Sequence, residues 1–366
     1  FIIGDCGMKV AVACGGTGGH IFPGLATAEE LVRRGHTVTL WLAGKGIESA
    51  AAAGWNGPVV TLPASGFETR VSLRAITTAW TLWRAGVEGR RRMRQDPPDV
   101  LLAMGSYASV GPVLAALRLR IPVVLHEANV VPGRAIRFFA RRAAAVGISF
   151  DGSAYYLKGA KLVQTGMPIR RALAESAKAL PQRTAWEHAR TVLVMGGSAG
   201  AQNLNQEAPP ALITVAKAIP DLRVIHLTGR MGESAVCAAY AAAGLDAEVH
   251  AFTHEMAALY ARADFAISRS GAASCAELSA FGLPALLIPY PFAVADHQRA
   301  NARAMERVGA ADVVADEDLR AAWLADYLLA RLRDPAKLRQ MSEASRSRAQ
   351  HNGAGALADL VERSAR

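Results

Sequence analysis

The chain of 366 residues is 51% hydrophobic and 20% charged, a balance that excludes an intrinsically disordered protein. Its length favours two domains, each able to bury its own core. With 41 lysines and arginines against 31 aspartates and glutamates, the net charge is +10. We therefore expect an anionic partner, which is nucleic acid, a phosphorylated substrate or an acidic membrane surface.

Cysteine usage and hydropathy exclude further classes of protein. The four cysteines are scattered without a CxxC pair, which argues against a disulfide framework or a zinc site and fits a reducing cytosol. No apolar run reaches the roughly 18 residues of a transmembrane helix. The first seven residues lack the features of a signal peptide, and Met8 is interpreted as the natural start. We expect a soluble or peripheral protein on the cytoplasmic side.

Strands and helices are expected to alternate along both halves of the chain, an order typical of parallel, doubly wound sheets. Gly166, Pro168 and Pro181 interrupt the periodicity between the halves. The strands expected in the first half are Lys9–Cys14, Thr37–Leu42, Val59–Leu62, Val100–Ala103, Pro122–His126 and Ala144–Ile148. Those expected in the second half are Thr191–Met195, Leu222–Leu227, Glu248–Phe252, Ala263–Ser268 and Ala285–Pro289.

Each half carries a glycine-rich turn after an apolar strand, at Gly15–Gly19 and at Gly196–Ala201. Such turns let a phosphate approach the backbone, and Ser198 adds a hydroxyl to the second turn. The first turn lacks the GxGxxG spacing, and the next strand ends without an acidic residue to hold an adenosine ribose, so an NAD site is disfavoured. We predict two Rossmann-like domains that face each other across a cleft, with a ligand at each switch point.

Polar residues after these turns and strands are the candidates for catalysis. His20 follows the first turn, where it either bonds locally near a helix start or acts on the acceptor as a general base or positioning group. His126, Glu127 and Asn129 end a buried strand, where they either face the cleft or satisfy loop backbone. Arg170 stands at the break between the halves, where it either clamps a diphosphate or forms an interdomain salt bridge.

The second half has its most informative stretch after the fourth expected strand. A turn at Ser270-Gly271 and a helix at Ala272–Phe281 would present backbone N–H groups to an anion. Glu277 has small or apolar helical neighbours, so it either caps a neighbouring backbone or accepts hydrogen bonds from a ribose diol. Further along, His297 and Gln298 offer donors and acceptors suited to sugar hydroxyls, and a metal site is disfavoured.

The segment Phe67–Arg94 combines an apolar stripe at helical spacing with many arginines. Tryptophan and arginine around such a stripe are typical of a helix that lies on anionic lipid. A core-facing stripe with a solvated basic flank explains the same pattern, whereas nucleic-acid binding lacks any RRM, KH, helix-turn-helix or zinc-finger signature. The candidate membrane patch consists of Leu73, Arg74, Ile76, Trp80, Trp83 and Arg84.

The chain resembles the MurG family, the glycosyltransferases of bacterial peptidoglycan synthesis, from Met8 onward. The resemblance rests on motifs in the family's order: GGTGGHIFPGLA, HEAN, TGMPIR, GGSAGAQNLN, SGAASCAELSAFGLPALLIP and DHQRANA. It implies a GT-B glycosyltransferase fold, an α/β architecture of two Rossmann-like domains with parallel sheets. It places an acceptor and membrane-binding domain at 1–168 together with a C-terminal helix at about 343–366, and a UDP-sugar donor domain at 169–342.

The resemblance also implies a reaction. N-acetylglucosamine would pass from UDP-N-acetylglucosamine to the muramoyl 4-hydroxyl of lipid I (undecaprenyl-pyrophosphoryl-MurNAc-pentapeptide), with inversion, giving lipid II and UDP. No cofactor is required, because the nucleotide sugar is a substrate. The implied location is the cytoplasmic face of the bacterial inner membrane. The anionic membrane surface is an expected partner, cell-wall and division proteins are candidate partners, and nucleic acid is not expected.

Residues that match the family's motifs receive roles from the resemblance. Glu277 would bind the uridine ribose, while Arg170 and Ser198 would contact the diphosphate. Ala128 and Ala199 stand where the family usually has glutamine, so any contact from that amide is lost here. The other donor residues are Phe252 and Thr253 around the uracil, and Ala272, Ala273, Ser274, His297 and Gln298 along the phosphates and sugar. The acceptor residues are Thr17, Gly18, Gly19, His20 and Asn129, of which His20 and Asn129 are the catalytic candidates.

Other functions compete with this interpretation. A second GT-B glycosyltransferase class uses membrane lipids such as diacylglycerol as acceptors. A UDP-N-acetylglucosamine epimerase shares the architecture but needs no lipid patch. A nucleotide-binding scaffold would bind UDP and lipid without turnover. A dinucleotide oxidoreductase is disfavoured most, because no acidic residue for a ribose follows the first glycine-rich turn.

Overall fold

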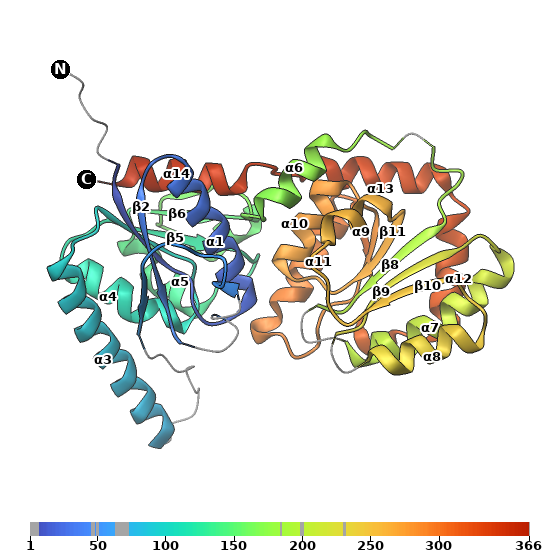
Figure 1. The fold of residues 1–366 in the computed structure, drawn as a ribbon, viewed down its shortest axis with the longest axis horizontal. Helices are drawn as coiled ribbons and strands as arrows, with labels where there is room; N and C mark the ends of the chain where they lie inside the picture. The colour runs from blue at the N-terminus through green and yellow to red at the C-terminus, as the bar shows by residue number, and fades with distance from the viewer. Residues whose placement is uncertain are drawn as a thin grey trace. The chain divides into compact units, whose positions relative to one another are not determined.

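The computed structural model describes residues 7–44, 48, 51–62, 73–183, 185–197, 201–229 and 232–365, apart from the side chains of residues 73–79 and 82. The chain divides into two compact units (Figure 1). The first unit comprises Phe1–Arg170 and Asn352–Arg366, and the second comprises Arg171–His351. Each unit is an α/β domain built on its own parallel sheet.

A seven-stranded sheet forms the centre of the first unit, in the order β3-β2-β1-β4-β5-β6-β7. Successive residues of β1 face opposite sides, so Val10 packs into one hydrophobic core and Ala11 into the other. All the strands expected in this half are present, and β7 is an additional strand at the edge. The strands are β1 (Lys9–Ala13), β2 (Thr37–Leu42), β3 (Val59–Thr61), β4 (Val100–Ala103), β5 (Val123–Glu127), β6 (Ala145–Ile148) and β7 (Leu162–Gln164).

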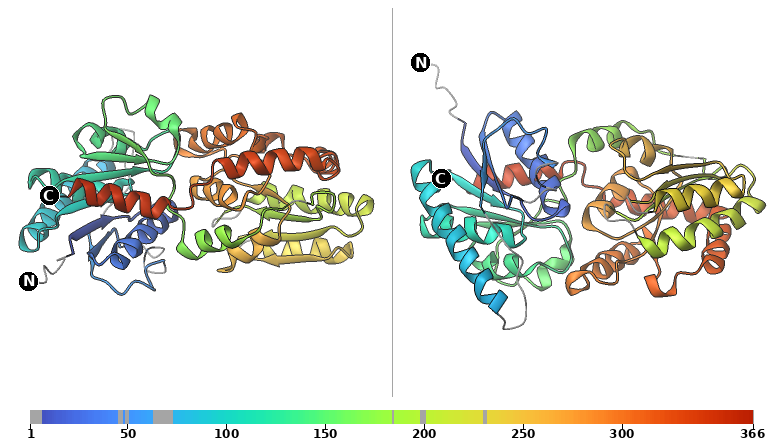
Figure 2. Two further views of the ribbon diagram at one scale, coloured as in Figure 1. Left: turned by 90° about the horizontal axis from the view of Figure 1, so that it is seen from above. Right: turned by 60° about the horizontal axis from the view of Figure 1, so that its bottom comes forward.

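Helices cover both faces of this sheet. α1 (Gly18–Arg33) and α14 (Gly353–Ser364) pack on one face, and a 2.6 Å ion pair between Arg34 and Asp359 joins them at their rim. Figure 2 shows α14, drawn in red, within the same unit as the blue β1 and α1. The other helical elements are α3 (Leu73–Gln95), α4 (Val110–Arg118), α5 (Arg134–Phe139), η1 (Tyr107–Ser109), η2 (Ala140–Arg142) and η3 (Asp151–Tyr155).

The boundaries between the units differ from the expected ones. The helix expected at about 343–366 is two helices, because α13 (Pro335–Ser347) lies in the second unit and only α14 returns to the first. The apolar pattern runs through both helices and so does not mark the break between them. A Cβ on Gly353 would lie 2.5 Å from the Met167 carbonyl oxygen. Glycine at this position therefore lets the start of α14 pack closely against the backbone at Met167. The other boundary falls after Arg170 rather than after Pro168.

A six-stranded sheet forms the centre of the second unit, in the order β10-β9-β8-β11-β12-β13. Its strands are β8 (Thr191–Met195), β9 (Arg223–Leu227), β10 (Ala247–His250), β11 (Phe265–Ser268), β12 (Ala285–Leu287) and β13 (Ala311–Val313), the last being an edge strand that the sequence did not indicate. The helical elements are α6 (Arg171–Ala179), α7 (Gln202–Ala218), α8 (Glu233–Ala242), α9 (Met256–Arg262), α10 (Ala272–Phe281), η4 (Val294–Asp296), α11 (His297–Arg307), η5 (Asp316–Asp318), α12 (Ala321–Leu332) and α13.

The strand order reverses once in each sheet. In the first unit β1 lies between β2 and β4, and in the second β8 lies between β9 and β11. Open parallel sheets bind ligands outside the carboxyl ends of the strands at such a switch point. The two glycine-rich turns follow β1 and β8, so both lie where the topology predicts a ligand.

Candidate functional site

The first glycine-rich turn leads directly into α1. Thr17 occupies the N-cap position, and its hydroxyl oxygen lies 2.8 Å from His20 Nδ1. Gly18 and Gly19 form the first turn of the helix, where backbone N–H groups have no acceptor within the helix itself. The four candidate acceptor residues of this loop therefore come together on one helical turn at the switch point of the first sheet.

A buried carboxylate, which the sequence analysis did not single out, fixes this turn. Glu48 is 1% exposed, and its Oε1 accepts a 2.6 Å hydrogen bond from the Gly16 amide. Its Oε2 accepts from the amides of Ala43 and Gly44, at 2.8 and 2.7 Å, beyond the end of β2. The Gly16 amide thus donates within the protein rather than to an anion. No sequence pattern indicated Glu48, because its role depends on a contact with Gly16, which is distant in the chain.

His126 and Glu127 both bond loop backbone, Glu127 in its own loop and His126 in the loop after β7, which is one of the two possibilities that the sequence left open. Glu127 is buried and accepts from the amides of Asn129 and Gly133, at 2.8 and 2.9 Å. Its burial raises the pKa of the carboxyl to about 7. His126 Nε2 lies 3.0 Å from the Gly166 carbonyl oxygen, and burial lowers the pKa of this imidazole to about 4, so it is neutral at pH 7. Glu127 thereby fixes the position of Asn129 at the end of β5.

Helix α10 begins at the switch point of the second sheet. Gly271 is its N-cap, and Ala272, Ala273 and Ser274 form the first turn. Glu277 lies one turn further on and is half-buried. The hydroxyl of Tyr260, a buried residue of α9, donates a 2.7 Å hydrogen bond to Glu277 Oε2. Tyr260 is a second residue that the sequence analysis missed, because a tyrosine on a short apolar helix carries no signal of its own.

The loop between β12 and α11 is tied to the turn before α10. The Ser270 hydroxyl donates to the Gln298 carbonyl oxygen at 2.8 Å, and the Asn301 side chain donates to the Ser270 carbonyl oxygen at 3.1 Å. The Tyr290 amide donates to Gln298 Oε1 at 3.0 Å, which orients that side chain. His297 Nδ1 lies 2.8 Å from the Val294 carbonyl oxygen. Because a carbonyl only accepts, Nδ1 carries a proton and Nε2 is the other polar atom of the ring.

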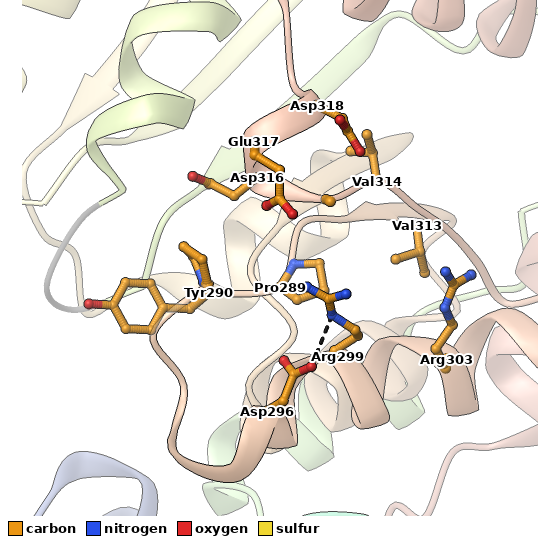
Figure 3. Close-up of a pocket in the computed structure, with 12 residues that line it drawn as sticks. Pro289, Tyr290, Asp296, Arg299, Arg303, Val313, Val314, Asp316, Glu317 and Asp318 are labelled. Atoms are coloured by element: carbon orange, nitrogen blue, oxygen red, sulfur yellow. Dashed lines mark ion pairs between the residues drawn. The ribbon is translucent and has the colours of Figure 1, made fainter.

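A pocket of about 330 Å³ lies beside this loop, between α11 and η5 (Figure 3). Arg299 and Arg303 extend from α11 toward the segment that carries Glu317 and Asp318. Arg299 Nε already forms a 3.0 Å ion pair with Asp296 Oδ2. The candidate donor residues Ala272, Ala273, Ser274, Glu277, His297 and Gln298 do not line this pocket. The pocket therefore lies next to the loop between β12 and α11, but it is not the donor site that the sequence predicted.

Comparison with known proteins identifies the family. Residues 10–148 match the glycosyltransferase family 28 N-terminal domain, and residues 191–359 match the glycosyltransferase family 28 C-terminal domain. A relative from Geobacter sulfurreducens is 36% identical over 361 residues, covering 98% of this chain and 99% of its own. Its name is UDP-N-acetylglucosamine--N-acetylmuramyl-(pentapeptide) pyrophosphoryl-undecaprenol N-acetylglucosamine transferase. A relative of the same name from Acidithiobacillus ferrooxidans is 39% identical over 354 residues, covering 96% of each chain.

The solved structures agree with these sequence relatives. The crystal structure of Acinetobacter baumannii MurG has a TM-score of 0.79 and 29% identity, and covers 97% of this chain and 99% of its own. The chain belongs to the MurG family. A UDP-GlcNAc 2-epimerase from Neisseria meningitidis, bound to UDP-GlcNAc, has a TM-score of 0.68 at 13% identity and covers 97% and 100% of the two chains. At that identity the likeness shows a common GT-B fold alone.

Three of the residues matched to the MurG family, Phe252, Thr253 and Arg170, take no part in the hydrogen bonds described above for the two glycine-containing turns and α10. Phe252 is 62% exposed, and its ring meets that of His254 edge-on at 4.9 Å. The Thr253 hydroxyl accepts from the Glu255 amide at 3.0 Å just before α9. Arg170 is the last residue of the first unit before the second begins, whereas the resemblance places it in the donor domain. Ser198 lies outside the described residues.

The candidate membrane patch is partly described. Trp80 and Trp83 of α3 are 58% and 52% exposed, and their rings stack at 4.8 Å. Arg84 is exposed beside them, whereas Ala85 and Met93 form the buried face of the helix. The tryptophans therefore do not belong to the core-facing stripe. The side chains of Leu73, Arg74 and Ile76 lie outside the described part. Among the described residues, no helix is both long and apolar enough to span a bilayer.

Proposed function

We propose that this chain transfers N-acetylglucosamine from UDP-N-acetylglucosamine to the muramoyl 4-hydroxyl of lipid I, giving lipid II and UDP. The observation that carries the proposal is the first turn of α10 together with Glu277, one turn further on. There Tyr260 holds a half-buried carboxylate close to helix N–H groups that have no acceptor within the helix. A uridine diphosphate presents the matching groups, a ribose diol for the carboxylate and an anion for the helix start. The full-length MurG relatives bear names with the same donor and acceptor.

The donor half of the site stabilises the leaving group in this proposal. UDP departs as an anion, so the N–H groups at the start of α10 and the guanidinium of Arg170 favour its departure. The oriented side chain of Gln298 and the Nε2 of His297 lie on the next loop, where sugar hydroxyls need polar partners. No metal or other cofactor is assigned a step.

The acceptor half activates the hydroxyl. We assign the general base to His20, because the Thr17 hydroxyl can accept from Nδ1–H and so leave Nε2 basic. The acceptor oxygen bonds to the anomeric carbon as the bond from that carbon to the UDP oxygen breaks. The acceptor proton passes to His20, and a single displacement inverts the anomeric centre. Asn129 is held by Glu127 as a further polar contact for the acceptor.

Membrane attachment belongs to the same proposal. An acceptor with an undecaprenyl chain stays in the bilayer, so the enzyme works at its surface. The exposed Trp80, Trp83 and Arg84 on α3 supply the aromatic and basic groups that bind an anionic interface. Because UDP-N-acetylglucosamine is a cytoplasmic substrate, we place the enzyme on the cytoplasmic face of the inner membrane.

An acceptor comparison tests the proposal. The enzyme is incubated with labelled UDP-N-acetylglucosamine and either a lipid I analogue, diacylglycerol or no acceptor. We expect label only in the lipid I product. Transfer to diacylglycerol alone would assign the chain to another lipid glycosyltransferase class, and conversion of the donor without acceptor would make it an epimerase.

A further inference from the structure

The peptide unit between Gly15 and Gly16 is held at both of its polar atoms. The Ser106 hydroxyl donates a 2.7 Å hydrogen bond to the Gly15 carbonyl oxygen, and the Gly16 amide donates a 2.6 Å hydrogen bond to Glu48 Oε1. Ser106 follows β4, whereas Glu48 lies beyond β2. Two side chains from opposite neighbours of β1 therefore clamp the turn that precedes α1.

Ser106 adopts a backbone conformation that suits glycine. Its φ is 63° and its ψ is 169°. A residue with a side chain is strained in this region, whereas glycine is not. Its side chain is fully used, because Oγ donates to Gly15 and accepts from the Ala108 amide at 3.1 Å. Serine at this position thus combines backbone strain with a hydroxyl contact to the glycine-rich turn.

The clamp leaves the turn little freedom. A Cβ on Gly16 would lie 2.6 Å from Ser106 Oγ, and a Cβ on Gly15 would lie 2.7 Å from the Ala43 amide nitrogen. Thr17 and His20 follow this fixed peptide unit within one helical turn. Gly105, which precedes Ser106 in the chain, lies against the His20 ring: a Cβ added to Gly105 would be 3.5 Å from that ring.

We propose that Ser106 and Glu48 are positioning residues for the acceptor reaction. They fix the Gly15–Gly16 peptide unit and thereby the placement of Thr17 and His20. The strain at Ser106 is retained because its hydroxyl holds the turn. This inference rests on the function proposed above, and it concerns the acceptor step alone, since both residues belong to the first unit, whereas α10 belongs to the second.

Ser106→Gly tests the inference, because it removes the hydroxyl and relieves the strain in one change. We expect the melting temperature to equal or exceed that of the wild type, while kcat/KM for a water-soluble lipid I analogue falls about tenfold. KM for UDP-N-acetylglucosamine should stay within about twofold of the wild type. Glu48→Gln, which loses the second carboxylate oxygen, should also lower kcat/KM for the lipid I analogue.

A control variant separates the effect of relieving backbone strain from the effect of losing the contact to the glycine-rich turn. Arg120 also has a positive φ of 59° but lies in the turn after α4, away from the clamp, so Arg120→Gly should change stability without changing acceptor kinetics. Unchanged acceptor kinetics in Ser106→Gly would overturn the inference, as would an equal loss for donor and acceptor. Absence of transfer by the wild-type enzyme would instead contradict the proposed function.

Discussion

Individual buried groups at the site have measurable consequences, and Glu127 is the clearest. It is 4% exposed, and burial raises its pKa from the ordinary 4.5 of a glutamate to about 7. Between these pH values the folded protein holds a proton that the unfolded chain has released. The contribution of this carboxyl to stability is therefore complete below about pH 4.5 and is lost as the pH rises through about 7.

Glu127→Gln should remove this pH dependence. A shift of this size corresponds to roughly 3 kcal/mol between the two ends of the range, an order-of-magnitude figure. The free energy of unfolding of the wild type, measured by urea titration, should therefore fall more steeply from pH 4.5 to 7.5 than that of the variant. Parallel curves for the two proteins would show that Glu127 does not titrate in this range.

In the proposed reaction, Tyr260 acts on the donor through Glu277. Tyr260→Phe removes the hydroxyl that donates to Glu277 Oε2 at 2.7 Å and leaves the ring in the core. Losing one hydrogen bond to a carboxylate costs about 1.5–3 kcal/mol, so KM for UDP-N-acetylglucosamine should rise roughly tenfold. KM for the acceptor analogue should not change.

Tyr327→Phe is the matched control for Tyr260→Phe. It also removes a hydroxyl bonded to a carboxylate in the second unit, at 2.6 Å from Asp312 Oδ2, but on α12. We expect normal kinetics from this variant. An equal rise in donor KM for both variants would mean that the effect is general destabilisation.

At the scale of elements, the sequence predicted most strands from their apolar residues, including the short β3 and β12, and missed β7 and β13. β1, β4 and β5 are almost entirely buried and mostly apolar, whereas β7 and β13 are three-residue edge strands with partly exposed residues. The helix starts after β1 and β11 were predictable from the glycine-rich turn Gly15–Gly19 and from the turn at Ser270-Gly271. The contacts of Glu48 and Tyr260 were not, because they join elements that are distant in the sequence.

Helix α3 gives a prediction of its own. Trp80→Ser combined with Trp83→Ser removes two exposed, stacked rings, and Arg84→Glu reverses an exposed charge. Each change should weaken binding to anionic vesicles, by about thirtyfold for the tryptophan pair, since interfacial aromatic side chains and basic residues each contribute on the order of 1 kcal/mol.

Vesicle sedimentation measures this effect. Trp323→Ser is the control, because Trp323 is 41% exposed and also stacks on an aromatic ring, but on α12. Neutral vesicles should bind all variants weakly. If the α3 variants bind anionic vesicles as the wild type does, the membrane surface lies elsewhere.

At the scale of the whole molecule, the end of the chain completes the first unit. Leu357 of α14 is fully buried in the core that contains Val10 and Leu25. The sequence predicted an apolar helix here but placed its start about ten residues early, because α13 continues the same pattern. The last helix is therefore a structural part of the domain that carries the acceptor residues.

Leu357→Ala should destabilise the first unit specifically. Removing a buried leucine side chain costs roughly 2–5 kcal/mol. Hydrogen exchange should accelerate in β1, β4 and β5, while protection in β8 and β11 stays as in the wild type. Leu328→Ala, at a fully buried position of α12, should give the reverse pattern. Acceleration in both units from either change would mean that the units unfold together.

The most direct test of the account is UDP release from UDP-N-acetylglucosamine, with and without a lipid I analogue, by the wild type and by Glu277→Ala. We predict release that depends on the acceptor and that falls at least tenfold in kcat/KM for the donor in the variant, because the ribose loses its carboxylate partner. Release by the wild type without acceptor, or full activity in Glu277→Ala, would contradict the proposed reaction or its donor site respectively.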